Sequence, residues 1–111
     1  MQSWNINEVE VESSKPVVLD TESEGRAILI QLSAGEKLGE HQVHERAWLL
    51  VAAGKIEISD AAGESASGGA GMLTIFDPNE RHEIIAKTDS RLLLVLSPWP
   101  GRGHPREDTS D

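Results

Sequence analysis

Short apolar segments recur along the chain at intervals of roughly eight to twelve residues, and turn-forming residues separate them. Residues 47–52 are apolar throughout, as in a buried strand, whereas residues 55–59 alternate between apolar and polar side chains. No segment sustains the 3.6-residue period of an amphipathic helix. The pattern predicts an all-β fold, a small antiparallel barrel or sandwich. Strands are predicted over residues 16–19, 26–32, 47–52, 55–59, 72–76, 81–87 and 91–97, with a short strand near 64–67 inside the turn-rich stretch 60–71.

The length of 111 residues suits one domain that buries a core of its own. We predict a single domain over residues 1–111 with its core at about 16–98. A polar, acidic N-terminal extension (1–15) precedes this core, and a C-terminal tail with several proline and glycine residues (99–111) follows it. We expect the Trp99 indole to anchor the tail on the barrel, and we interpret His104 as an ordinary tail residue.

The formal net charge of -9 argues against two classes of partner. An acidic surface repels phosphate backbones and anionic lipid, so we expect neither nucleic-acid nor membrane binding. No apolar run approaches the length of a membrane span, and the first residues do not resemble a signal peptide. We therefore expect a cytoplasmic protein. The chain contains no cysteine, which excludes disulfides and thiolate chemistry.

Two of the four histidines occupy related settings. His41 follows a glycine-containing turn and precedes the apolar strand 47–52. His82 follows the turn signal of residues 77–79 and begins the strand 81–87. We expect these two strands to lie side by side, with both imidazoles pointing into the barrel. A pair of inward histidines at the mouth of a barrel suits a metal site or an acid–base site.

The spacing around both histidines follows a regular arrangement. Five residues separate Gly35 from His41. Five residues also separate Gly71 from the turn at residues 77–79, and two more residues lead to His82. This arrangement resembles the two conserved motifs of the cupin superfamily, at the right separation and over about residues 27–96. The resemblance implies a cupin barrel, also described as a double-stranded β-helix of jelly-roll type.

The resemblance also implies a metal site, and here the chain departs from the family pattern. Metal-binding cupins use three histidines and a glutamate around iron, manganese, nickel, zinc or a similar ion. His41 matches the first ligand and His82 the last, but Val43 stands in place of the second histidine. Six residues separate Ala47 from Gly54, which places Ala47 at the glutamate position. Neither replacement side chain binds a metal.

Two neighbouring residues offer a substitute for the missing ligands. His44 and Glu45 lie next to the expected positions, in a segment where a β-bulge would change which side chain points inward. The metal site implied by this reading consists of His41, His44, His82 and Glu45, with one divalent transition metal. The alternative is that no metal binds, and that the histidines are polar residues lining a pocket.

Three functions therefore stay open at this point. The chain is a metal-dependent enzyme acting on a small polar substrate, or a metal-free module that binds a small molecule in the barrel, or a structural or regulatory dimer. In the second reading His41, His82, Arg46 and Arg81 line the pocket. The substrate and the reaction are not predicted.

The apolar strand also predicts a contact surface. If position 47 faces inward together with Leu49 and Val51, then Trp48 and Leu50 face outward. A tryptophan and a leucine on an outer sheet face form an exposed apolar patch. The N-terminal strand or the tail could cover this patch, but we expect a homodimer interface.

Overall fold

A computed structural model describes residues 1–41 and 43–104, without the side chains of Glu40 and His41. Within this part of the chain all regular secondary structure is β-strand, which confirms the predicted all-β class. Its nine strands are β1 (Val17–Glu22), β2 (Gly25–Leu32), β3 (Lys37–His41), β4 (Arg46–Ala53), β5 (Lys55–Asp60), β6 (Ser65–Gly69), β7 (Leu73–Phe76), β8 (His82–Ala86) and β9 (Ser90–Ser97).

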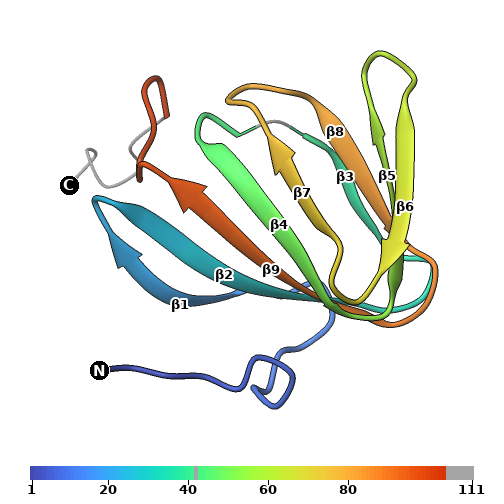
Figure 1. The fold of residues 1–111 in the computed structure, drawn as a ribbon, viewed down its shortest axis with the longest axis horizontal. Coiled ribbons are helices and arrows are strands. Elements are labelled where there is room, and N and C mark those ends of the chain that lie inside the picture. The colour runs from blue at the N-terminus through green and yellow to red at the C-terminus, as the bar shows by residue number, and fades with distance from the viewer. Residues whose placement is uncertain (42, 105–111) are drawn as a thin grey trace.

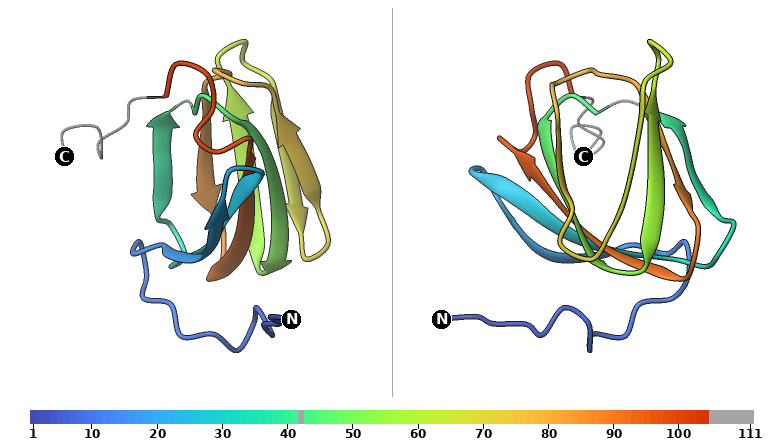
Figure 2. Two further views of the ribbon diagram at one scale, coloured as in Figure 1. Left: turned by 90° about the vertical axis from the view of Figure 1, so that its left-hand side faces the viewer. Right: turned by 45° about the vertical axis from the view of Figure 1, so that its right-hand side comes forward.

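The strands form two sheets that face each other (Figures 1 and 2). The five-stranded sheet has the order β1-β2-β9-β4-β7, and the four-stranded sheet has the order β3-β8-β5-β6. Neighbouring strands are antiparallel throughout. The chain passes from one sheet to the other several times, as in a jelly roll. β3 and β7 end, and β4 and β8 begin, at the same end of the two sheets (Figure 1), which we call the mouth.

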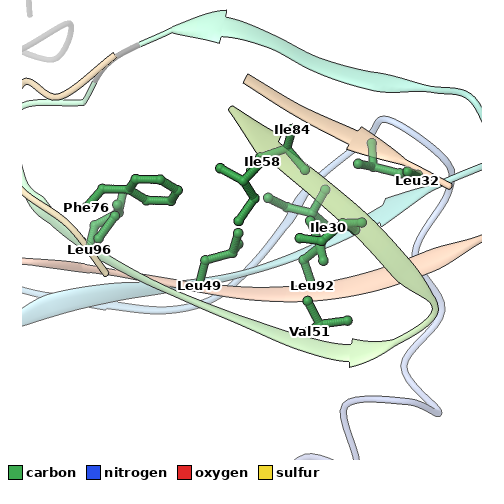
Figure 3. Close-up of a cluster of buried hydrophobic side chains, with 12 residues drawn as sticks. Ile30, Leu32, Leu49, Val51, Ile58, Phe76, Ile84, Leu92 and Leu96 are labelled. Carbon is green, nitrogen blue, oxygen red and sulfur yellow. The ribbon is translucent and has the colours of Figure 1, made fainter. Parts of the chain in front are cut away.

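Side chains point alternately to the two faces of each strand, and those that point inward fill the space between the sheets. In β4 the inward residues Ala47, Leu49 and Val51 are each 1% exposed. They meet inward residues of the opposite sheet such as Ile58 and Ile84 (Figure 3). Removing these side chains from water is the main stabilising term of the fold. The remaining buried members of the cluster are Ile30, Leu32, Ile56, Phe76, Ala86, Leu92 and Leu96.

The outward residues of β4 form a second apolar surface, as the alternation predicts. Trp48 on β4 pairs with Ile75 on the edge strand β7, and Leu50 on β4 pairs with Leu73 on β7. Leu73 is 56% exposed and Ile75 is 51% exposed, while Trp48 and Leu50 are half-buried. The outer face of the five-stranded sheet therefore presents large apolar side chains to solvent.

The predicted pairing of strands 47–52 and 81–87 is wrong. β4 lies between β9 and β7 in one sheet, and β8 lies between β3 and β5 in the other. The apolar pattern reports that both strands are buried, but it does not specify their partners. The strand that pairs with β8 is β3. It contains Gly39 and begins two residues after Gly35, in the stretch that the sequence predicted to be a turn leading to His41. β3 is an edge strand, so its sequence lacks a strong apolar signal.

The N-terminal extension lies against the five-stranded sheet. The Arg91 guanidinium on β9 donates hydrogen bonds to the carbonyl oxygens of Ile6, at 2.8 Å, and Val9, at 2.7 Å. Ser13 forms an isolated bridge with Gln31 of β2. These contacts attach to the sheet a segment that forms no long strand of its own.

Glu36, in the turn between β2 and β3, fixes the end of this extension. Its carboxylate accepts hydrogen bonds from the Ser13 hydroxyl, from the Ser33 N–H at 2.6 Å and from the Ser14 hydroxyl at 3.1 Å. Each of these donors stabilises the ionised carboxylate. The Ser13 hydroxyl above all, followed by the Ser33 N–H, holds the pKa of Glu36 below its ordinary value of 4.5.

Gly54 makes the tight connection between β4 and β5. Its φ angle is +90°, a conformation that only glycine adopts readily. A Cβ atom at this position would lie 2.3 Å from the carbonyl oxygen of Asp89 and 2.3 Å from the hydroxyl oxygen of Ser90. Both the backbone conformation and the close approach therefore require glycine.

Candidate ligand-binding site

Glu45 lies at the mouth, immediately before β4. It is two residues from Ala47, so strand alternation directs both side chains toward the interior. The Glu45 side chain has no exposed surface. A carboxyl group without contact with water needs hydrogen bonds or opposite charge from the protein, because burial otherwise disfavours it strongly.

The C-terminal tail supplies these contacts. We call residues 98–104 the strap, since they fold back over the mouth from the end of β9 (Figure 2). The Gly101 N–H donates a hydrogen bond of 2.7 Å to Glu45 Oε2. The Nδ1 atom of His104 also lies 2.7 Å from Oε2, but it is not aligned for a hydrogen bond. Within the part of the chain that the structure describes, Glu45 Oε1 and His104 Nδ1 are therefore buried without a hydrogen-bond partner.

Aromatic and cationic groups hold the strap in place. The Trp99 ring meets the His104 ring edge-on, with 4.6 Å between ring centroids, and packs against the hydrophobic core. The Trp99 ring has a second contact, with Arg26. The guanidinium lies over the ring, 4.0 Å from its centroid, in a cation–π arrangement. The His44 ring lies 5.5 Å from the His104 ring, also edge-on.

Gly101 is buried at the closest approach of the strap to the barrel. A Cβ atom on Gly101 would lie 2.7 Å from the carbonyl oxygen of His44 and 3.1 Å from Glu45 Cγ. The strap can therefore reach the carboxyl group of Glu45 only because this residue has no side chain.

The two histidines that match the cupin motifs lie opposite each other. The backbones of His41 and His82 pair across β3 and β8. The His82 side chain is 4% exposed and stacks on the Phe76 ring, with 3.8 Å between centroids and 7° between planes. Its Nδ1 atom lies 3.3 Å from the carbonyl oxygen of Glu80. The His41 side chain, and with it the expected role of His41 as a ligand, lies outside the described residues.

The described residues do not fit the ligand set of metal-binding cupins. Ala47 is part of the hydrophobic core, and Val43 packs against that core. Glu45 is engaged by the strap, and the His44 ring lies against that of His104. No group of three or more histidine, aspartate or glutamate side chains suitable for a metal ion occurs among the residues whose positions are given.

The two arginines predicted to line a pocket lie near the mouth but on its outer side. Arg46 is exposed and forms an ion pair of 2.7 Å with Asp77. Arg81 is the residue immediately before β8, and it is exposed. The structure thus brings Glu45, His44 and His104 together, and it does not add either arginine to that group.

Sequence reasoning missed Gly101 and His104 as site residues. The prediction for Trp99 as an anchor of the tail agrees with its contacts to the core and to Arg26. The only signal in the sequence for the other two was a run of proline and glycine after an apolar strand, which is equally typical of a tail without contacts.

Comparison with known proteins identifies the fold. No protein-family model and no curated protein matches the chain. An RmlC-like cupin protein from Desulfovibrio desulfuricans is similar in structure, with a TM-score of 0.80 and 17% sequence identity over 88% of this chain and 97% of that one. An RmlC-like cupin from Shewanella frigidimarina has a TM-score of 0.74 and 22% identity over 96% and 93% of the two chains.

A protein with a double-stranded β-helix domain from Klebsiella pneumoniae is also similar, with a TM-score of 0.76 and 17% identity over 88% of this chain and 90% of that one. The chain therefore has the cupin fold, and the resemblance inferred from the two motifs is confirmed for the fold. The part of the chain described in the structure contains no helix long and apolar enough to cross a membrane.

Proposed function

We propose that this chain is a cupin-fold module that binds a small molecule at the mouth without a metal ion, and that Glu45 anchors the ligand. The observation that carries this proposal is the Glu45 carboxyl group, which has no exposed surface and one oxygen, Oε1, without a hydrogen-bond partner among the described residues. An unsatisfied buried acceptor costs about 1–3 kcal/mol. A ligand that donates a hydrogen bond to Oε1 would recover this free energy on binding.

The residue types at the mouth favour this function over metal-dependent catalysis. Of the four positions used by metal-binding cupins, positions 43 and 47 carry valine and alanine, which have no ligand atoms. The two substitutes considered from the sequence, His44 and Glu45, already contact the strap. First-row metals need several nitrogen or oxygen ligands around one point.

A thermal-shift screen tests the role of Glu45. The probes are a panel of small sugars, carboxylic acids, amides and amines, applied to the wild type, to Glu45→Gln and to a control variant, Glu57→Gln. Glu57 lies on β5, is partly exposed and forms an ion pair with Lys87 at 3.4 Å. A ligand at ten times its Kd stabilises by about 1.4 kcal/mol, a shift of about 6 °C.

We expect at least one probe to stabilise the wild type and Glu57→Gln but not Glu45→Gln, each shift being measured from the variant's own melting temperature. The proposal is overturned if no probe stabilises the wild type, or if Glu45→Gln responds as strongly as the control.

Metal analysis tests the other half of the proposal. Protein purified without a nickel column is expected to contain less than about a tenth of an equivalent of iron, manganese, nickel or zinc, before and after incubation with each ion. An equivalent of one metal that His82→Ala removes would instead support the metal-dependent enzyme.

We further propose that the chain forms a homodimer through the outer face of the five-stranded sheet. Leu73 and Ile75 extend the apolar surface of Trp48 and Leu50 to the edge strand β7. Exposed apolar patches of this kind are typical of interfaces between proteins. An interface between two copies would cover the same surface on each, as a two-fold axis requires.

A further inference from the structure

The strap occupies the same carboxyl group that the proposed ligand would use. Glu45 Oε2 receives the Gly101 N–H and faces His104 Nδ1, both at 2.7 Å. Both nitrogen groups belong to the strap, in which Gly101 lies 56 residues further along the chain than Glu45. The contact is therefore made by the segment that follows β9, and not by the strands that form the core.

The contacts of the strap describe the chemistry that the site accepts. Glu45 is engaged by nitrogen groups only, one from the backbone and one from an imidazole. The imidazole lies between aromatic rings, with Trp99 at 4.6 Å and His44 at 5.5 Å. Planar nitrogen groups donate strong hydrogen bonds to carboxylates and stack well beside aromatic rings.

We propose that the strap is an internal competitor for the Glu45 site, and that the ligand which displaces it carries a planar nitrogen donor of the amidine, guanidine or imidazole class. This inference rests on the proposed function, and it adds the chemical class of the ligand and the regulation of its entry. The net charge of -9 favours the approach of such a cation over that of an anion.

Gly101 allows the competition to be tested in the full-length protein. Alanine at this position places a Cβ atom 2.7 Å from the carbonyl oxygen of His44, so Gly101→Ala weakens the closed strap. The matched control is Gly39→Ala, because a Cβ atom at Gly39 would meet no atom within 4 Å. His104→Ala is a second variant that opens the site by removing one contact without crowding the backbone.

The probe is benzamidine, a planar aromatic amidine, and benzamide is its uncharged counterpart of similar shape. Calorimetric titration is expected to give a benzamidine affinity about ten-fold higher for Gly101→Ala than for the wild type or Gly39→Ala. The reason is that a strap which is open only about a tenth of the time in the wild type lowers the apparent affinity about ten-fold. His104→Ala is expected to change the affinity in the same direction. Benzamide is expected to bind more weakly than benzamidine, and Glu45→Gln in the Gly101→Ala background is expected to abolish the gain.

The outcomes separate this inference from the proposed function. Equal benzamidine affinity in the wild type, Gly101→Ala and His104→Ala overturns the competition, while binding that still depends on Glu45 leaves the proposed function intact. If benzamidine binds to none of these proteins, the nitrogen-donor class is wrong, and the broader probe panel decides the proposed function separately. If Gly101→Ala fails to fold by circular dichroism, His104→Ala carries the test alone.

Discussion

Replacing Trp99 with alanine tests how firmly the strap is held to the barrel. The Trp99 ring is half-buried, packs against the core, meets the His104 ring at 4.6 Å and lies under the Arg26 guanidinium at 4.0 Å. A fully buried aromatic side chain typically contributes about 3–5 kcal/mol relative to alanine. Half of that value is about 2 kcal/mol, and the cation–π contact adds about 0.5–1 kcal/mol.

We therefore expect Trp99→Ala to lower the free energy of unfolding by about 2–3 kcal/mol, which corresponds to about 8–12 °C in Tm for a domain of this size. The assay is urea denaturation followed by circular dichroism, together with a thermal melt. Trp4→Ala is the control, because Trp4 is 42% exposed and its loss is expected to cost less than about 0.5 kcal/mol. If Trp99→Ala and Trp4→Ala unfold at the same urea concentration, Trp99 does not anchor the strap.

Three further predictions concern other parts of the fold. Gly54→Ala is expected to lower the free energy of unfolding in urea by about 3 kcal/mol or more, because a clash is added to the strain at positive φ. Gly63, with φ of +89°, has open space around it, so Gly63→Ala is expected to cost only about 1 kcal/mol. Equal losses in the two variants would contradict the clash at Gly54. Because the pKa of Glu36 is lowered in the folded protein, this carboxylate adds stability above pH 4.5, and that stability is lost as the pH falls through the folded-state pKa. Glu36→Gln is therefore expected to lose less stability than the wild type between neutral and acidic pH. Parallel profiles of stability against pH would refute this. If the wild type forms the proposed dimer, the double variant Leu73→Lys/Ile75→Lys is expected to be a monomer by light scattering, and an unchanged mass would exclude this face as the interface.

Much of the fold could be predicted because strand alternation is a local property. Side chains alternate between the two faces of a strand, so once position 47 is taken to face inward, Leu49 follows it into the core and Trp48 lies on the outer face, as the structure has them. The spacing of glycine and histidine residues resembles the two cupin motifs, and that resemblance predicted the cupin fold. The same local signals did not reveal β3, an edge strand with little apolar sequence.

The candidate site could not be assembled in the same way. His44 and Glu45 were noted from the sequence as polar residues beside the expected ligand positions, and His82 from its motif. The partners of Glu45 lie in the tail, 56 residues away for Gly101, and no pattern along the chain links the two segments. The sequence also suggested that strands 47–52 and 81–87 are neighbours, whereas β4 and β8 lie in opposite sheets.

The sequence by itself thus determined the all-β class, the alternation of faces along the predicted strands, and the absence of ligand atoms at positions 43 and 47. Only the tertiary structure decided which strands pair and what surrounds Glu45. The physical reason is the range of the interactions. Side-chain direction follows from the backbone of a few consecutive residues, whereas the hydrogen bond from Gly101 to Glu45 depends on where the end of β9 directs the strap after the two sheets have packed.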